Sequence, residues 1–191
     1  MKMVIKMKLM SDIIFGNGMS VPGAEDISVL HDQYGFPYYK GSTFKGVVRE
    51  NYERYLGWLG DSESEIENKC NELFGNEGDD LRAKKLRFSD FVLSPNVKKT
   101  ILNEVGENKP NEVLEILTNI RTFTSIDGNG VAKEGSLRMA RSVDKDLCFY
   151  SEVECDATEK EKLKEVIESI KWLGSMRNRG FGKVKLTVEE G

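Results

Sequence analysis

The sequence is poor in the residues that build metal centres and disulfide frameworks. Its 191 residues include three cysteines, none of them in a CxxC pair, and a single histidine, His31. These are too few soft ligands for a structural zinc site or a set of disulfides. The cysteines fall on apolar stripes, where a free thiol acts as a small core residue. A reducing, cytoplasmic setting is therefore expected.

Long apolar runs are missing as well. No stretch approaches the ~20 residues that a membrane helix needs. Lys2, Lys6 and Lys8 interrupt the N-terminus, where a signal peptide would carry its apolar segment. We expect a soluble chain with no membrane partner. With 39% hydrophobic residues, the length suits one domain around a single core, or at most two small ones.

Charge is unevenly distributed, although the net charge is only −4. Residues 61–80 hold eight acids and one base, whereas residues 169–188 hold five bases and no acid. A second acid-free stretch, 33–49, interleaves three bases with aromatic residues. Such a mixture is able to contact both phosphates and base faces. On composition alone, a solvated surface with uneven charges explains the pattern equally well.

Hydrophobic periodicity predicts both strands and helices. Apolar side chains alternate through residues 1–9, 147–155 and 184–188, and we expect a further strand near 85–93. Helical spacing predicts three helices: from Ser42 to about Gly60 with Ser42 or Thr43 as N-cap, over 62–74, and from a Thr158/Glu161 capping box to Gly174.

The segments between these elements are expected as insertions, about 61–84 and 94–143, outside the main core. The second contains a short helix after Pro110 and a hairpin over 126–139, whose tip is Asp127-Gly128-Asn129-Gly130 with Asp127 as its cap. Without the insertions the order is strand, helix, strand, strand, helix, strand. This order predicts an α+β, ferredoxin-like (RRM-like) βαββαβ fold in a single domain over residues 1–191. The fold alone implies no function.

Two segments have the chemistry of phosphate binding. At 41–49 a helix begins, where free N–H groups and the helix dipole favour anions, and Lys45 and Arg49 share one face. At 174–182 three glycines allow close backbone approach, and Arg177 and Arg179 offer bidentate phosphate contacts. The alternatives are an ordinary capped helix with exposed bases and a flexible connection.

An ordered set of motifs resembles the RAMP superfamily of CRISPR-associated proteins. It comprises residues 23–32 (GAEDISVLHD), residues 35–46 (GFPYYKGSTFKG) with Arg49, and the Arg179-Gly180-Phe181-Gly182 loop. Leu73-Phe74-Gly75, Arg87-Phe88-Ser89-Asp90 and the run from Arg121 through Ile126-Asp127 to Gly135 follow the family order as well. Within the superfamily, the sequence is most similar to the repeated backbone subunit of type III CRISPR effector complexes.

This resemblance implies a ferredoxin-like palm with an inserted thumb hairpin, here within 121–141. It implies copies stacked in a filament along a CRISPR guide RNA, with complementary target RNA and other type III effector subunits as partners, in antiviral defence. The implied RNA-binding positions are Ser42, Thr43, Lys45, Arg49, Arg138, Arg141, Arg177, Asn178, Arg179, Gly180 and Phe181.

The resemblance also implies a metal-dependent endoribonuclease. Asp26 matches the aspartate that cleaves target RNA with Mg²⁺ or another divalent cation, needed for cleavage only. Such a carboxylate binds the metal or helps deprotonate the ribose 2′-hydroxyl. Glu25 and Asp32 are further candidate metal ligands. Asp26 is equally suited to capping a turn, and His31 is not expected to be catalytic.

Four functions therefore stand at this point. The first is a backbone subunit that binds guide RNA and cuts target RNA at Asp26. The second is a non-catalytic guide-binding scaffold in the same complex, and the third is a metal-independent guide-processing ribonuclease. The fourth is an acidic interaction protein unrelated to RNA. The sequence departs from the family pattern at Lys40, Ser175 and Glu25, where proline, glycine and an apolar residue are common.

Overall fold

A central strand with one buried face organises the fold. The computed structural model describes residues 2–16, 25–75, 86–155 and 157–190. Strand β1 (Lys2–Leu9) buries Met3, Ile5, Met7 and Leu9 completely, as the alternation predicted. It pairs antiparallel with β6 (Cys148–Glu154) on one side and β7 (Val184–Glu190) on the other. Both of these strands were predicted.

The outer edge of the sheet consists of two short strands. β2 (Arg87–Phe88) and β3 (Val92–Leu93) both pair antiparallel with β6, so the strand order is β2-β6-β1-β7 with β3 also beside β6. The continuous strand predicted near 85–93 is therefore interrupted. Between its two parts, Ser89 turns its N–H and hydroxyl to β6, and Asp90 turns to the next helix. Lys85, Gly23 and Ala24 lie outside the described residues.

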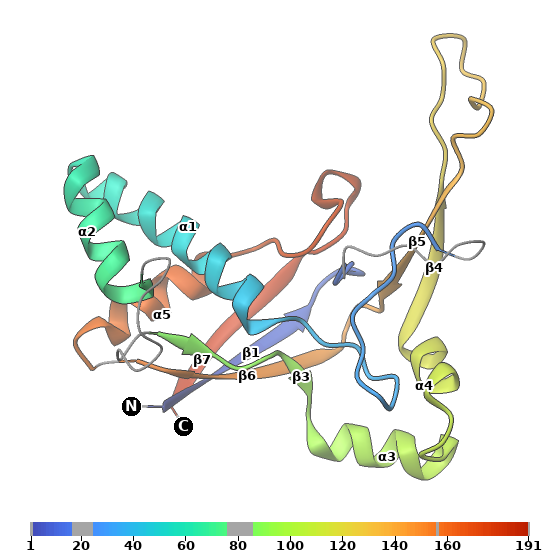
Figure 1. The fold of residues 1–191 in the computed structure, drawn as a ribbon, viewed down its shortest axis with the longest axis horizontal. Coiled ribbons are helices and arrows are strands. Elements are labelled where there is room, and N and C mark those ends of the chain that lie inside the picture. The colour runs from blue at the N-terminus through green and yellow to red at the C-terminus, as the bar shows by residue number, and fades with distance from the viewer. Residues whose placement is uncertain (1, 17–24, 76–85, 156, 191) are drawn as a thin grey trace.

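Two helices pack on the apolar face of this sheet. α1 (Gly41–Leu59) and α5 (Lys160–Ser169) contribute to one hydrophobic core with the strands, and α2 (Glu63–Phe74) lies beside α1 at the end remote from the second hairpin (Figure 1). No helix among the described residues is long and apolar enough to cross a membrane. The apolar side chains that these helices bury are Phe44, Val48, Tyr52, Leu56, Cys70, Phe74, Leu163, Val166 and Ile167.

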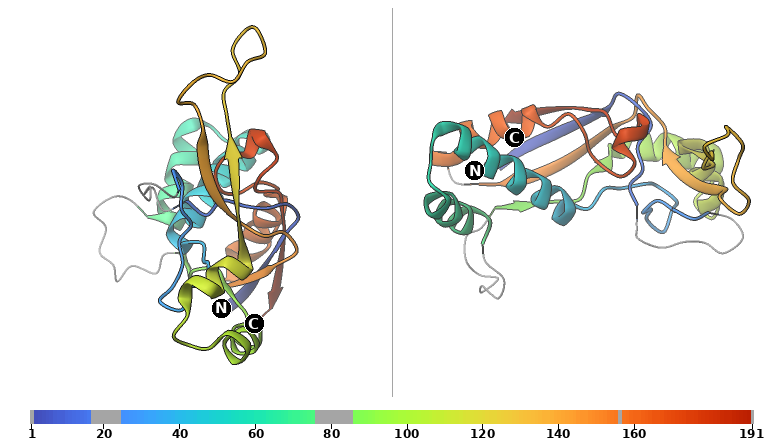
Figure 2. Two further views of the ribbon diagram at one scale, coloured as in Figure 1. Left: turned by 90° about the vertical axis from the view of Figure 1, so that its right-hand side faces the viewer. Right: turned by 90° about the horizontal axis from the view of Figure 1, so that it is seen from above.

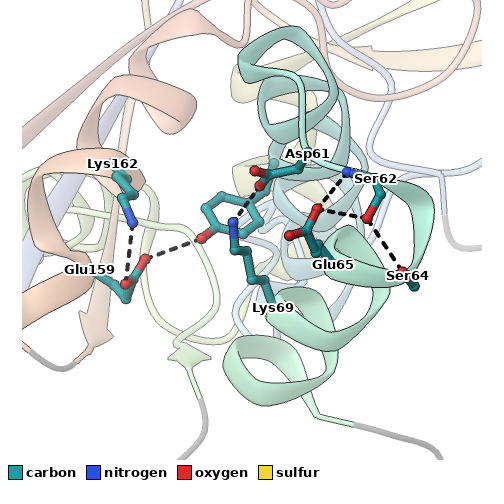
Figure 3. A network of polar contacts seen from close by, with 8 residues as sticks. Asp61, Ser62, Ser64, Glu65, Lys69, Glu159 and Lys162 are labelled. Atoms are coloured by element: carbon teal, nitrogen blue, oxygen red, sulfur yellow. Dashed lines mark hydrogen bonds and ion pairs between the residues drawn. The ribbon is translucent and has the colours of Figure 1, made fainter.

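Polar contacts connect the three helices at this end of the molecule (Figure 3). Ser62 and Glu65 form a capping box at the start of α2, and the hydrogen bonds from Ser62 lower the pKa of the Glu65 carboxyl. Tyr52 on α1 donates its hydroxyl to Glu159, 3.1 Å away, just before α5. Burial and the nearby Glu159 carboxylate raise the pKa of Tyr52, so this hydroxyl remains a donor at neutral pH.

Helix ends differ from the sequence predictions in three places. α1 begins at Gly41 with Lys40 as N-cap, so neither Ser42 nor Thr43 caps it. α5 follows a 3-10 turn (Ala157–Glu159) and has Glu159 as N-cap, so the Thr158/Glu161 capping box is wrong. α5 also ends at Ser169 and not at Gly174, because residues 171–173 are extended and bond to the 182–184 backbone.

The segment between β3 and β6 forms two helices and a second sheet. α3 (Pro95–Val105) was not predicted, whereas α4 (Pro110–Leu117) was. Val113, Leu117 and Val143 belong to the main core, so the expectation that this whole segment lies outside it is wrong. Val113 and Leu117 are the apolar face of α4, which explains their burial.

The second sheet is a long hairpin of β4 (Thr118–Phe123) and β5 (Arg138–Val143). Its base is regular antiparallel ladder, and residues 124–137 extend away from the rest of the molecule (Figures 1 and 2). The hairpin is longer than the predicted 126–139. Asp127 caps its tip as predicted, because its Oδ1 accepts the N–H groups of Asn129 and Val131 at 2.8 and 2.9 Å.

Gly180 and Gly182 provide a matched test of how the chain returns into β7. Both have left-handed φ angles, +86° and +83°, but a Cβ at Gly182 would overlap the carbonyl oxygen of Leu173, whereas a Cβ at Gly180 meets open space. Gly180→Ala should lower the free energy of unfolding by about 1 kcal/mol, the cost of backbone strain alone. Gly182→Ala should cost at least about 2 kcal/mol more because atoms overlap as well. Urea denaturation measures both; equal losses would contradict this packing.

Candidate functional site

Asp26 lies where the loop after β1 meets the base of the hairpin. Its side chain is exposed, and its Oδ2 accepts the N–H of Met139 on β5 at 2.7 Å. The N–H groups of Asp26 and Ile27 donate to the carbonyl oxygen of Met139 at 2.8 and 3.2 Å, and the N–H of Arg141 donates to Ile27 at 2.9 Å. The loop therefore adds a short parallel pairing to the edge of β5, with Asp26 at its end.

Glu25 is turned the opposite way, into the protein. It is 7% exposed, and its Oε1 accepts a hydrogen bond from Nε of Arg141 at 2.6 Å. The Arg141 guanidinium also donates to Oγ1 of Thr118 at 2.9 Å. Glu25 and Asp26 therefore do not converge on one point, although they are neighbours in the sequence.

Asp32 stabilises a turn. Its Oδ1 accepts the N–H groups of Tyr34 and Phe36 at 3.0 and 3.1 Å, and its Oδ2 pairs with Nζ of Lys98 at 2.9 Å. Within residues 2–16, 25–75, 86–155 and 157–190, no three His, Cys, Asp or Glu side chains gather to hold a metal ion. A cation at Asp26 would need most of its ligands from RNA phosphates and water, an arrangement common for Mg²⁺.

The N-terminus of α1 already carries a carboxylate of the protein itself. The N–H of Gly41 donates to Oδ1 of Asp90 at 2.8 Å. Ser42 and Thr43, next along the helix, have exposed side chains. Asp90 thus satisfies one of the free helix N–H groups and complements the helix dipole.

Arg49 connects α1 to α2. Its guanidinium pairs with Glu53 at 3.1 Å and donates to Oδ1 of Asn71 at 3.0 Å and to the carbonyl oxygen of Gly75 at 3.3 Å. These three acceptors all belong to the protein. Arg49 therefore has a structural role that its spacing from Lys45 did not indicate.

The arginine-rich loop before β7 is fixed against the hairpin base. A 3-10 turn, η2 (Arg177–Arg179), presents Arg177, Asn178 and Arg179 to solvent. Behind it, Phe181 is 9% exposed and contacts the ring of Phe123 on β4 edge to face, with 5.8 Å between centroids. The Arg179 guanidinium lies 5.3 Å from the centroid of the same Phe123 ring. Both the turn and its arginines are thus attached to the hairpin.

A groove runs between this loop, the end of β1 and the hairpin base. Besides Arg179, Gly180 and Phe181, it is lined by Met10, Ser11, Asp12, Arg121, Thr122, Phe123 and Lys145. Asp12 pairs with Arg121 at 3.1 Å and accepts the N–H of Lys145 at 3.1 Å. Sequence reasoning did not select Arg121 or Lys145 as binding residues, and only the folded chain brings them beside Arg179.

Tyr39, under the arginine-rich loop, is a buried neutral group. Burial raises the pKa of Tyr39 to about 12, and the positive charge of Arg177 acts weakly in the opposite direction. Its hydroxyl therefore stays protonated at neutral pH. On the hairpin, Arg138 is exposed, and its guanidinium donates to the carbonyl oxygen of Leu137 at 3.1 Å.

A small second core holds the candidate segments together. Ile14, Ala140 and Phe181 form its centre, and Ile27, Phe123 and Met176 pack against it. These residues come from the end of β1, the Asp26 loop, both hairpin strands and the arginine-rich loop. The predicted site residues Asp26, Arg177, Asn178, Arg179, Gly180 and Phe181 therefore meet at the hairpin base. The helix group with Ser42, Thr43, Lys45 and Arg49 belongs to the main core instead.

Removal of the Asp90 carboxylate tests whether it caps α1. Asp90→Ala should lower the free energy of unfolding by about 1 kcal/mol, the usual cost of losing a helix cap. Asp90→Asn keeps an acceptor for the Gly41 N–H and should lose less, since only the interaction of the charge with the helix dipole disappears. Thermal and urea unfolding measure the difference. An Asp90→Ala variant as stable as the wild type would contradict this cap.

Comparisons with known proteins agree with the architecture. The family model described as RAMPs, the RAMP superfamily, matches residues 6–185. A chain from a cryo-EM structure of the type III-B Cmr-beta complex bound to cognate target RNA is 14% identical, with a TM-score of 0.70 over 98% of this chain and 97% of that chain. A chain from the apo state of Cmr-beta is 13% identical, with a TM-score of 0.71 over 98% and 96% of the two chains.

At these identities the structural likeness shows a shared fold. No curated protein matches the sequence. The match to the family model, in contrast, covers nearly the whole chain, including both glycine-containing segments and the hairpin. The chain belongs to the RAMP superfamily.

Proposed function

We propose that this protein is an RNA-binding backbone subunit of a type III CRISPR effector complex. Family membership supports this assignment, and so does the fold, which is shared with Cmr-beta chains over almost the full length of both. We further propose that the main sheet is a ferredoxin-like palm. Its order β2-β6-β1-β7, with α1 and α5 on one face, is the order that a βαββαβ chain produces. The projecting hairpin corresponds to a thumb.

The observation that carries the proposal is the meeting of three segments at the thumb base. The exposed arginines of η2, the basic groove and the Asp26 loop all surround one small apolar cluster. Arginine supplies bidentate phosphate contacts, and exposed bases attract a polyanion whatever the net charge of the chain. A guide RNA backbone is the proposed ligand of this surface. Complementary target RNA, other effector subunits and further copies of the chain in a filament are the proposed partners.

Asp26 is the proposed catalytic residue. Its exposed carboxylate lies beside the thumb strand, where a target strand displaced by the thumb would pass. Together with phosphate oxygens, Asp26 would hold a divalent cation, which neutralises charge on the scissile phosphate when bound. Asp26 accepts the proton of the ribose 2′-hydroxyl. The 2′-oxygen then forms a bond to the adjacent phosphorus as the bond to the 5′-oxygen breaks.

A scaffold without cleavage activity is the second candidate, and one observation favours it. The Asp26 carboxylate accepts the N–H of Met139, which is the behaviour of a structural turn aspartate. Guide processing by metal-independent acid–base catalysis has less support, because the only histidine, His31, is exposed and bonds through Nδ1 to the carbonyl of Asp32.

RNA binding by η2 is tested with Arg177→Ala/Arg179→Ala. In filter binding with guide RNA, the double variant should bind about tenfold more weakly, and the salt dependence of log K should decrease by about 2, one for each lost phosphate contact. Arg54→Ala is a matched control, since Arg54 is an exposed arginine on α1 that pairs with Glu50. Similar losses in both variants would contradict a specific role of the loop.

Cleavage is tested with two substitutions that separate charge from hydrogen bonding. Asp26→Asn keeps an acceptor for Met139, whereas Asp26→Ala does not. In a rebuilt effector complex with Mg²⁺, both should cut guide-complementary RNA at least about a hundredfold more slowly while still binding it, because the lost group acts as acid–base catalyst.

Asp146→Asn is the matched control for this charge change. Asp146 is exposed and has a left-handed φ of 70°, which asparagine also adopts. This variant should cut like the wild type. A wild-type complex that binds the target without cutting it would exclude the catalytic proposal and favour the scaffold.

A further inference from the structure

We infer that Glu25 and Arg141 are a positioning pair that aligns the Asp26 carboxylate with the thumb. This inference rests on the proposed function of Asp26. It gives both residues a role different from that expected from the sequence, since Glu25 was a candidate metal ligand and Arg141 a candidate RNA contact.

Burial argues against direct contact of either residue with RNA. The side chains of Glu25 and Arg141 are 7% and 13% exposed. Nε of Arg141 donates to Oε1 of Glu25 at 2.6 Å, Nη2 contacts the same oxygen, and Nη1 donates to Oγ1 of Thr118. The Thr118 hydroxyl in turn donates to the carbonyl oxygen of Leu114 on α4. The guanidinium is therefore surrounded by acceptors of the protein.

The pair fixes the register of the Asp26 loop on β5. The pairing of residues 25–27 with β5 is short, and a shift by one residue would turn Asp26 inward and Glu25 outward, because successive side chains point to opposite sides. In the observed register Ile27 pairs with Ala140 and Glu25 reaches Arg141. A shifted register would leave Arg141 as an unpaired buried charge, which is strongly unfavourable.

The consequence is that Asp26 and the thumb base move as one body. Asp26 accepts the N–H of Met139, two residues before Arg141 on the same strand. A displacement of β5 therefore carries the carboxylate with it. Glu25 keeps the direction of the neighbouring Asp26 side chain constant relative to any strand that lies on the thumb.

The test uses Glu25→Gln with two readouts, one of which needs no cleavage. In the free chain, hydrogen exchange at the Asp26 and Ile27 amides should become about tenfold faster, because the pairing with Met139 opens more often. In the rebuilt effector complex, cleavage of saturating target should slow by about tenfold or more, since a misplaced catalytic group reduces the rate of the chemical step. Target affinity and the Mg²⁺ concentration for half-maximal cleavage should stay unchanged.

Three further variants keep the test specific. Glu53→Gln is the matched control, because it breaks the Arg49–Glu53 pair on α1 and should change neither readout. The charge swap Glu25→Arg/Arg141→Glu should recover part of the lost cleavage and part of the amide protection. Arg141→Lys, which keeps the charge but loses the fork, replaces Glu25→Gln if that variant does not fold, with a smaller effect in the same direction.

Two outcomes would overturn the inference. Unchanged exchange at the Asp26 and Ile27 amides would show that the pair does not hold the loop. A raised Mg²⁺ requirement in Glu25→Gln would instead identify Glu25 as a metal ligand. A wild-type complex that binds target without cutting it would refute the proposed catalysis of Asp26, and with it the positioning role in catalysis. The exchange rates would still report the clamp itself.

Discussion

The attachment of the hairpin base to the palm is the constraint on which the rest of the site depends. Ile14, Ala140 and Phe181 come from three segments far apart in the sequence and meet in one small apolar cluster. If this cluster were lost, the Asp26 loop and the arginine-rich turn would no longer share a support. The hairpin tip needs no such packing, because its residues 124–137 extend away from the molecule (Figure 2).

The main core determines where this attachment lies. β1 is paired on both sides, so its end is fixed, and the backbone of residues 11–13 leads directly into the groove and the hairpin. Charge follows the same geometry. The acidic α2 lies at the opposite end of the molecule from the hairpin (Figure 1), while Arg121, Lys145 and Arg179 line the groove. An RNA strand is thereby directed to one end of an overall acidic chain.

Sequence patterns were sufficient for elements with strong periodicity and insufficient for contacts between segments. The alternation in residues 2–9 and the helical spacing from 41 to 59 predicted β1 and α1 because one face of each packs on the core. α3 was missed, although Ser94 and Pro95 are a typical N-cap and N1 pair. The Glu25–Arg141 pair spans 116 residues, so no local pattern could reveal it. Without that contact, Glu25 looked like a second carboxylate of the catalytic loop.

Ultraviolet crosslinking of guide RNA to the rebuilt effector complex tests the central claim most directly, with the crosslinked peptides of this chain identified by mass spectrometry. The account predicts crosslinks to peptides that contain η2 and Phe181 and to the β4 strand with Arg121 and Phe123. Crosslinks confined to α2 and the adjoining end of α1, with none at the thumb base, would contradict it.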